Sequence, residues 1–351
     1  MHCAPRYPSR VWLALAAVAA ALATLAPAPA LATTLRNAPD PIPNIVSINL
    51  GGIDLNGRKE TVTAMQVLVY LPGNAKINPS TDTAPGGPYR ILLYAHGRPA
   101  YASERAKLQR PVHARHVHYW LSKGYAVVAP IRPGYGTSSA KDQESSGVGY
   151  SASGQCIRQP TPAHLAANAG RAMRAALDWT QQQPWARANH IVLEGQSAGG
   201  LATVALCAGG AGGSAPNAPL HRSLTAPSAT PPSPAPGIVG CINFSGGAGG
   251  DPQHAPGKVC APEKITALML QYGSTTHAPS LWLYAPNDLY WGAAAPQQWH
   301  RAFNQAAAAA NATPATFYQS PAIGSDGHSL QRAGSTHWAP VLDAWLKKNK
   351  L

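Results

Sequence analysis

Seven short apolar runs rich in β-forming residues recur along the chain, and helical patterns separate most of them. The runs occupy residues 63–71, 90–97, 125–130, 190–195, 238–244, 279–285 and 315–319. The expected helices occupy about residues 103–123, 163–183, 198–209, 296–310 and 338–349. Short apolar strands that alternate with helices form a mainly parallel sheet, because each helical crossover returns the chain to the same end of the sheet. The pattern predicts an α/β protein with helices on both faces of the sheet.

The first 32 residues have the pattern of a secretory signal peptide. Arg6 and Arg10 precede a long apolar run that ends in small residues at Ala30-Leu31-Ala32. This order is typical of an exported protein with cleavage after Ala32. We therefore expect a secreted or periplasmic protein, and no later run is apolar for long enough to span a bilayer.

Beyond the signal peptide, we expect an arm and one large domain. Residues 33–60 are expected to form a loosely packed arm, and residues 61–351 to form a single domain. Within it, segment 211–237 is rich in Pro, Ala, Ser and Gly and predicts a flexible surface insertion. The chain has 351 residues with 45% apolar content, which is enough for a sizeable core.

The chain is strongly basic. Its formal net charge is +13, and loss of Arg6 and Arg10 leaves 25 basic against 14 acidic residues, or +11. The basic residues are scattered singly or in pairs, so we expect no nucleic-acid partner. A basic surface of this kind favours anionic polymers and cell envelopes.

The segment EGQSAGG, residues 194–200, joins an apolar run directly to an expected helix. A strand that turns sharply into a helix needs a strained residue at its tip, and Gly195 and Gly199 on either side remove side-chain clashes. This G-x-S-x-G pattern is typical of a nucleophile elbow, with Ser197 as the nucleophile. The helix N-terminus also favours a developing anion. The alternative is that Ser197 only caps the helix.

A serine hydroxyl becomes nucleophilic when a histidine takes its proton and an acid orients that histidine. On a scaffold with an elbow, the acid and the histidine follow the serine in that order. Asp288 follows run 279–285 and lies 91 residues after Ser197. His328 follows run 315–319 and lies 40 residues after Asp288. We therefore expect Ser197, Asp288 and His328 to form the catalytic triad.

Other acids and histidines compete for these roles. Asp251 follows run 238–244 and is the substitute acid, and His337 is the other late histidine, although it is expected to open the last helix. Asp326 is expected to shape the loop before His328. Glu194 lies within the elbow strand and is expected to point away from the site.

The oxyanion that forms on attack needs preorganised N–H donors. We expect one from Ala198, directly after the nucleophile, and one from Arg98, because the next residue, Pro99, has no N–H. The alternative for His96-Gly97 is a tight turn with a packed histidine.

A second group of residues is less specific. His113, His116 and His118 lie close in sequence, and a metal site is conceivable there. Because helical geometry puts only His113 and His116 on one face, solvated helix surface is the expected role and no metal or cofactor is expected. Tyr290, Trp291 and Tyr101 are candidates for the border of a substrate pocket.

Several motifs in order resemble the α/β-hydrolase superfamily. They are LLYAHGRP, GYAVVAPIRPGYGTSS, GQSAGG, CINFSGGAGG, SLWLYAPNDLYW and IGSDGH, over roughly residues 60–350. The resemblance is closest to the dienelactone-hydrolase-like and prolyl-oligopeptidase-like branches. It implies a mostly parallel sheet of eight strands and Ser-Asp-His catalysis without a cofactor.

The chain departs from both branches. Dienelactone hydrolases use a cysteine at the elbow, where this chain has Ser197, so lactone specificity does not carry over. Prolyl oligopeptidases carry a β-propeller before the hydrolase domain, and the sequence leaves no room for one.

Four cysteines remain after loss of Cys3, and they allow three pairings. Export favours disulfides, and the absence of a Cys-x-x-Cys pair disfavours the alternative of metal binding. In the topology that the resemblance implies, Cys156 and Cys260 lie at the carboxyl edge of the sheet, and Cys207 and Cys241 at the opposite edge. Our hypothesis is therefore Cys156–Cys260 and Cys207–Cys241.

Together these patterns predict a secreted serine hydrolase that acts on small-molecule or polymeric esters. One alternative is an amide or peptide hydrolase with the same triad. The other is a non-catalytic protein that binds the cell envelope through its basic surface. The sequence does not indicate which oligomeric state the protein adopts.

Overall fold

The computed structural model describes residues 39–50, 64–138, 142–209 and 236–351. The expected signal peptide, residues 33–38 and 51–60 of the arm, and residues 211–235 of the insertion lie outside the described residues. In the described ranges, no helix combines the length and the apolar character that a bilayer crossing requires.

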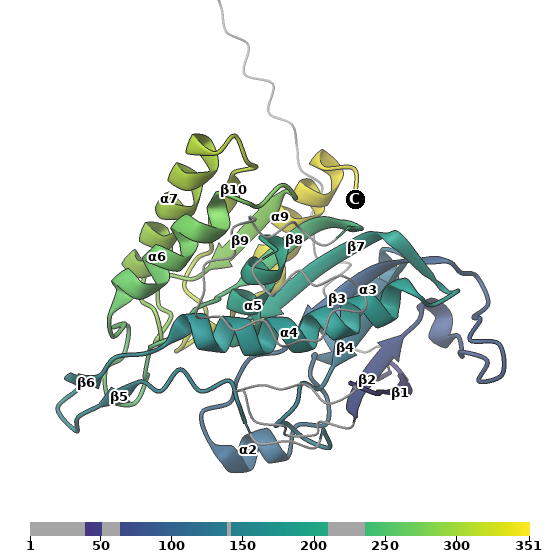
Figure 1. Cartoon of the computed structure of the whole chain (residues 1–351), viewed down its shortest axis with the longest axis horizontal. Coiled ribbons are helices and arrows are strands. Elements are labelled where there is room, and N and C mark those ends of the chain that lie inside the picture. Colours follow the sequence, from purple (N-terminus) through teal and green to yellow (C-terminus); the bar gives the residue numbers. More distant parts are fainter. Residues whose placement is uncertain (1–38, 51–63, 139–141, 210–235) are drawn as a thin grey trace, which may run out of the picture.

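Eight strands form one mixed sheet in the order β1-β2-β4-β3-β7-β8-β9-β10 (Figure 1). From β4 through β10 all neighbouring strands are parallel, whereas β2 is antiparallel to β4 and β1 is antiparallel to β2. The prediction of an α/β fold with a mostly parallel sheet of eight strands is confirmed.

Each of the seven apolar runs forms a strand of this sheet. They are β2 Met65–Tyr70, β3 Tyr89–Ala95, β4 Tyr125–Pro130, β7 Ala186–Gln196, β8 Ile238–Phe244, β9 Ser280–Tyr284 and β10 Ala315–Gln319. The eighth strand, β1 Asn44–Ile48, lies within the segment expected to be a loose arm. Its Val46 pairs with Val67 of β2, and Ile48 is buried in the core, so main-chain pairing and apolar burial order residues 44–48.

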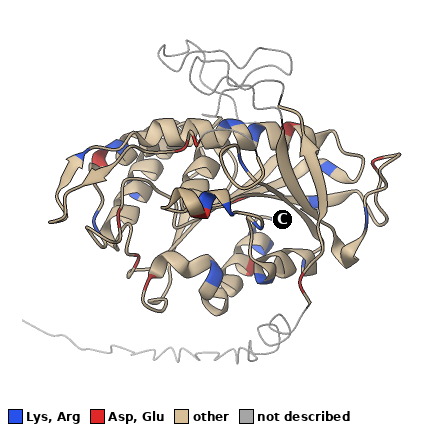
Figure 2. Cartoon of the chain, turned by 90° about the horizontal axis from the view of Figure 1, so that it is seen from below, with Lys and Arg blue, Asp and Glu red and all other residues tan. Residues whose placement is uncertain are grey.

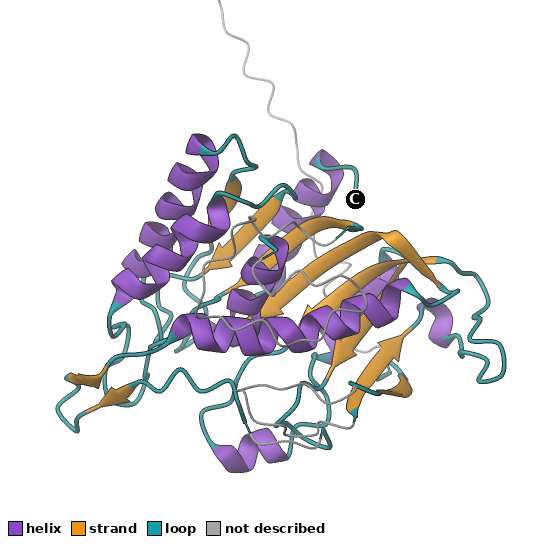
Figure 3. Cartoon of the chain, in the orientation of Figure 1, coloured by secondary structure: helices purple, strands orange, loops and turns teal. Residues whose placement is uncertain are grey.

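Helices cover both faces of the sheet (Figure 3). The longer ones are α3 Ala114–Ser122, α4 Pro162–Gln181, α5 Ala198–Cys207, α6 Pro262–Gly273, α7 Ala294–Ala309 and α9 Ser335–Lys348. Helices α4, α5, α6 and α7 pack on one face, and α3 and α9 pack on the other. Alternation along β3 supplies both cores, because Ile91 and Leu93 face one side and Leu92 and Tyr94 the other.

The expected helix over residues 103–123 is two helices. A short helix, α2 Ala102–Ala106, ends well before α3 begins at Ala114. Pro111 lies between them, and a proline removes a helical N–H and disfavours a helical conformation in the residue before it. The intervening segment runs along the cavity described below. Helix α6 was not expected from the sequence; it begins with Pro262 in the first turn, where a proline is well tolerated.

Two disulfides join the pairs that we hypothesised from the sequence, Cys156–Cys260 and Cys207–Cys241. Their Cα atoms are 5.5 Å and 6.6 Å apart, respectively. Cys156 belongs to a small hairpin, β5 Gly149–Tyr150 and β6 Cys156–Arg158, that extends beyond the sheet in Figure 1.

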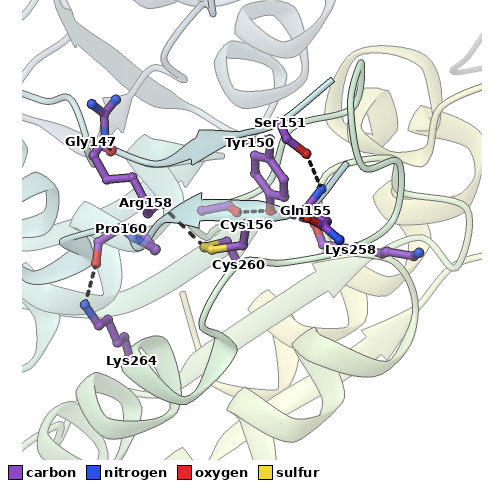
Figure 4. Close-up of a disulfide and its surroundings, with 11 residues drawn as sticks. Gly147, Tyr150, Ser151, Gln155, Cys156, Arg158, Pro160, Lys258, Cys260 and Lys264 are labelled. Carbon is purple, nitrogen blue, oxygen red and sulfur yellow. Dashed lines mark hydrogen bonds between the residues drawn. A yellow bond between two sulfur atoms is a disulfide. The ribbon is translucent and has the colours of Figure 1, made fainter. Parts of the chain in front are cut away.

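The hairpin is also tied down by hydrogen bonds around the disulfide (Figure 4). The Tyr150 hydroxyl donates to the Gly249 carbonyl at 2.7 Å, and Lys264 of α6 donates to the Pro160 carbonyl at 3.1 Å. The disulfide and these contacts therefore link the hairpin to the loop that follows β8.

Candidate active site

Ser197 occupies the turn between β7 and α5 with a left-handed backbone, φ 57° and ψ −123°. A non-glycine residue adopts this conformation only at a cost, so the surrounding structure must hold it there. The Ser197 N–H donates to the Phe244 carbonyl of the neighbouring strand at 2.9 Å. The strained residue at the tip of the turn is the geometry expected of a nucleophile elbow.

The glycines around Ser197 permit the turn because backbone crosses backbone there. A Cβ on Gly195 would overlap the Gly199 carbonyl oxygen, and a Cβ on Gly199 would overlap the Ala95 carbonyl oxygen of β3. Gly200 is equally constrained, because a Cβ there would collide with the Asn243 side chain. The sequence argument for Gly195 and Gly199 thus has a direct steric basis.

Asp288 and His328 are in direct contact. His328 Nδ1 lies 3.0 Å from Asp288 Oδ2, and the Asp288 side chain is fully buried. Asp288 Oδ1 accepts two further hydrogen bonds, from the N–H groups of Tyr290 at 2.8 Å and Trp291 at 3.1 Å. Because a carboxylate only accepts, Nδ1 carries the proton and Nε2 of His328 is left free to accept one.

The loop before His328 is shaped by Asp326, as the sequence suggested. Asp326 Oδ1 accepts from the N–H groups of His328 at 2.9 Å and Leu289 at 3.0 Å, so it joins the two loops that carry the acid and the base. The rings of Tyr290 and Trp291 lie 4.1 Å and 5.5 Å from the His328 ring, measured between centroids. The imidazole is therefore fixed by a carboxylate on one side and by aromatic rings on the others.

A cavity of about 390 Å³ opens above the elbow, and both Ser197 and His328 line it. The Ser197 hydroxyl makes no hydrogen bond to any other residue in the described part of the chain. In related catalytic pairs the bond between hydroxyl and imidazole is often long before substrate binds. The structure thus pairs Asp288 with His328 and places Ser197 and His328 on the same cavity.

The competing residues lie elsewhere. Asp251 forms a local turn, in which it accepts from His254 Nδ1 at 2.9 Å and from the Gln253 N–H at 2.9 Å. His337 lies in the first turn of α9 and is outside the residues that line the cavity. Glu194 is completely buried in β7, accepts a bond from Gln331 at 2.7 Å and is not among the residues that line the cavity.

The turn after β3 borders the same cavity through Gly97 and Arg98. Within the described residues, the N–H groups of Ala198 and Arg98 donate to no protein acceptor, so both are available to an oxyanion. The buried His96 ring holds the turn, since Nδ1 lies 2.7 Å from the Gly97 carbonyl and Nε2 accepts from the Arg132 N–H at 3.2 Å. Burial, and then the Arg132 charge, lower the pKa of His96 well below its ordinary value.

A buried ion pair behind this turn was not expected from the sequence. Arg132 donates from Nε and Nη2 to the two oxygens of Glu144 at 2.6 Å and 2.8 Å, and from Nη1 to the His96 carbonyl at 2.8 Å. The Tyr135 hydroxyl adds a bond to Glu144 at 2.7 Å. Arg132 lies in the motif GYAVVAPIRPGYGTSS, but its partner lies twelve residues away in a loop, which no local pattern reveals.

The expectation that His116 is solvated helix surface is wrong. His116 is buried, and its Nε2 lies 2.5 Å from Glu194 Oε1 in the elbow strand. Trp120, one turn further along α3, donates to Glu194 Oε2 at 3.1 Å. Helix α3 thus directs the polar groups of His116 and Trp120 into the core, where both contact the buried Glu194 carboxylate. In the described ranges, no group of three His, Cys, Asp or Glu side chains is arranged to hold a metal ion.

The three aromatic candidates have different positions. Tyr290 lines the cavity beside His328. Trp291 is buried and donates from Nε1 to the Ser245 carbonyl at 2.7 Å, so it supports the site from behind. Tyr101 is half exposed, bonds to Gln253 and is not among the lining residues.

Comparison with solved structures decides the fold. No protein-family model and no curated protein sequence matches the chain. An acylaminoacyl peptidase from Pyrococcus horikoshii matches with a TM-score of 0.52 and 12% identity, over 91% of this chain and 43% of that one. The chain has the α/β-hydrolase fold.

Two further solved structures are similar. A putative dipeptidyl aminopeptidase IV from Bacteroides ovatus matches with a TM-score of 0.51 and 12% identity, over 86% of this chain and 36% of that one. An esterase from Pyrococcus furiosus matches with a TM-score of 0.47 and 13% identity, over 90% of this chain and 94% of that one. The chain spans less than half the length of the two peptidases, and the expected α/β-hydrolase fold is confirmed.

Proposed function

We propose that the protein is a serine hydrolase that cleaves carboxylic esters, with Ser197, His328 and Asp288 as its catalytic triad. One observation carries the proposal: the buried Asp288 carboxylate binds Nδ1 of His328 on the wall of the cavity that Ser197 enters from a strained elbow. A structural serine needs neither this strain nor a histidine paired with a buried acid beside it.

In the proposed reaction, Ser197 Oγ attacks the ester carbonyl carbon while His328 Nε2 takes its proton. The N–H groups of Ala198 and Arg98 bind the oxyanion, and Asp288 stabilises the imidazolium. The C–O bond to the alcohol then breaks, and His328 returns the proton to the departing oxygen. Water, deprotonated by His328, attacks the acyl group, releases the acid and restores Ser197.

An amide or peptide hydrolase would use the same groups. The peptidases among the similar structures keep this alternative open, but their likeness concerns the fold. Matched p-nitrophenyl ester and p-nitroanilide substrates with one acyl group distinguish the two. We expect the ratio of ester to anilide hydrolysis rates to be far larger with the enzyme than without it.

Activity-based labelling tests the nucleophile. A fluorophosphonate probe is expected to label the protein at Ser197, and Ser197→Ala should abolish labelling and lower kcat by several orders of magnitude, since loss of a triad member removes the covalent route. Ser245→Ala is a suitable control, because Ser245 also has a positive φ but is buried and lies outside the cavity lining. Retained hydrolysis by pure Ser197→Ala protein would contradict the proposal.

A place outside the cytoplasm is part of the same proposal. The signal-peptide pattern supports it, as do the two disulfides, because such bonds persist in oxidising compartments. The non-catalytic alternative of envelope binding would be favoured if the probe left Ser197 unlabelled while the protein bound anionic polymer.

A further inference from the structure

The cavity at the elbow carries more positive than negative charge. Side chains of Arg98, Arg110 and Arg332 line it, and Asp326 is the one carboxylate among its described lining residues. Elsewhere the basic residues are scattered over many elements (Figure 2). Three guanidinium groups on one cavity of about 390 Å³ therefore need an explanation.

Two of the three arginines already have acidic partners. Arg98 pairs with Asp142, and Arg110 pairs with Asp40 in an exposed contact. Arg332, in the short helix α8 Leu330–Ala333, makes no hydrogen bond or ion pair with any residue in the described part of the chain. Its charge is thus uncompensated where it reaches the cavity.

No described residue of the cavity pairs with Arg332. Asp326, the one carboxylate among the described lining residues, accepts at Oδ1 from the N–H groups of His328 and Leu289 and forms no ion pair with Arg332. His113 lines the same cavity, and burial first and then the Arg332 charge lower its pKa, which keeps the ring neutral at pH 7. A neutral imidazole can donate a hydrogen bond to an anion bound at Arg332, but it supplies no counter-charge.

The position of Arg332 tells which part of an ester it would meet. It follows His328 by four residues in the continuous helical segment formed by η2 Gly327–Ser329 and α8, so it lies about one turn, or roughly 6 Å, beyond the base. The base must reach the oxygen of the departing alcohol, whereas the carbonyl oxygen faces the N–H donors of Ala198 and Arg98. An alcohol portion that extends past His328 along this segment would therefore meet Arg332.

We propose that Arg332 is a specificity residue that selects esters whose alcohol portion carries a carboxylate; this rests on the proposed ester hydrolysis. The planar guanidinium matches a carboxylate through two parallel hydrogen bonds. Arg332 is exposed where it lines the cavity, so a bound carboxylate can reach it and added salt should weaken the attraction. A preference of about tenfold would correspond to about 1.4 kcal/mol.

Two esters that differ only in this charge test the inference. 4-Acetoxybenzoate and its methyl ester share the acetyl group and the aromatic ring, and each releases a phenol that is followed by absorbance. We expect Arg332→Gln to lower the ratio of kcat/KM for the acid over the methyl ester about tenfold, and Arg332→Lys to lower it less. Because the readout is a change in a ratio, the different leaving-group reactivity of the two phenols cancels.

Arg301→Gln is the matched control. Arg301 is exposed on α7, away from the cavity lining, and its replacement changes the net charge by the same amount. We expect it to leave the ratio unchanged, and added salt to reduce the ratio of the wild-type protein toward that of Arg332→Gln.

The outcomes separate the two proposals. Turnover of both esters with equal ratios for the wild-type protein and Arg332→Gln would overturn the role of Arg332 and leave the ester hydrolase intact. A loss of ratio in Arg301→Gln equal to that in Arg332→Gln would also overturn it, because long-range charge alone would then account for the preference. No turnover of either ester, with no labelling of Ser197, would overturn the proposed function and this inference with it.

Discussion

The Asp288 carboxylate has both oxygens committed, one to His328 and one to the main chain that follows it. The Tyr290 and Trp291 N–H groups fix Oδ1, so Oδ2 can face only the imidazole. An uncharged amide at this position would still fit the space. Its NH₂ group would, however, face another donor, either the N–H groups of Tyr290 and Trp291 or the protonated Nδ1 of His328.

We therefore expect Asp288→Asn to lower kcat about 10⁴-fold while the protein remains folded, because the imidazole would be held in the wrong tautomer. The measurement is kcat on a p-nitrophenyl ester, with circular dichroism to check the fold. Asp251→Asn is the matched control at the competing acid and should keep nearly all activity. A large loss in Asp251→Asn with little change in Asp288→Asn would assign the acid to Asp251.

At the residue scale, the sequence could indicate Ser197, Asp288 and His328 because each follows a strand, and the ends of parallel strands share one edge of the sheet. It could not indicate Arg332. That residue differs from Arg98 and Arg110 only in lacking a partner, and pairing depends on loops that are distant in sequence. Likewise, nothing around His116 reveals that Glu194 lies opposite it.

Among the elements, the turn after β3 depends on a support that comes from elsewhere in the chain. His96 and Gly97 have no regular secondary structure to hold them, and Arg132, from the loop after β4, binds the His96 carbonyl. Glu144 keeps the Arg132 guanidinium in place at full burial. The turn after β3 is thus held in place by two loops that meet behind it, one with Arg132 and one with Glu144.

Removal of one charge from this buried pair should be costly. We expect Glu144→Gln to lower the free energy of unfolding by about 3 kcal/mol, because it leaves a buried guanidinium without its counter-charge. It should also lower kcat more than it raises KM, since the oxyanion donors would lose their position. Urea unfolding and steady-state kinetics measure the two effects.

The surface pair of Arg174 with Asp178 is the control for that experiment. Its atoms lie 2.7 Å apart within α4, and Asp178 is half exposed. Asp178→Asn should cost no more than about 0.5 kcal/mol and leave kcat unchanged. Equal stability losses in the two variants would show that burial does not distinguish the pairs.

The helices show where sequence patterns fail at this scale. The strands were indicated closely because each is an apolar run with clear ends. The long helix expected over residues 103–123 is in fact two helices on opposite sides of Pro111. The apolar periodicity alone does not indicate where the first helix ends. This break matters for the site, because Leu108, Arg110, Pro111 and His113 line the cavity instead of packing as helix.

The molecule as a whole gathers its chemistry at the carboxyl edge of the sheet. Strands β3, β7, β9 and β10 end there and lead to the proposed oxyanion donor Arg98, to Ser197, to Asp288 and to His328, respectively. Parallel pairing brings these residues together although they are distant in sequence. The Cys156–Cys260 bond ties a hairpin to the loop after β8, and Cys207–Cys241 joins the end of α5 to β8. Both disulfides therefore brace the elements that flank the elbow.

Histidines with a lowered pKa make the fold sensitive to mild acid. Burial is the first cause of a lowered pKa at His96, His113, His190 and His300, and the shift is greatest at His96. In the unfolded chain these rings take up protons near pH 6.5. Between that pH and the lower pKa of each folded group, the unfolded state binds more protons, so stability falls as pH falls.

We expect the free energy of unfolding to be level from pH 8 to 7 and to decline between pH 6.5 and 5, before most carboxylates titrate. A histidine that stays neutral in the fold contributes a slope of up to about 1.4 kcal/mol per pH unit. His96→Gln should reduce this slope the most, and His190→Gln less, because His190 is only partly buried. Urea unfolding at half-unit pH steps measures the slopes. A flat profile down to pH 5, or a slope unchanged by His96→Gln, would show that proton uptake by these histidines does not limit the stability of the fold.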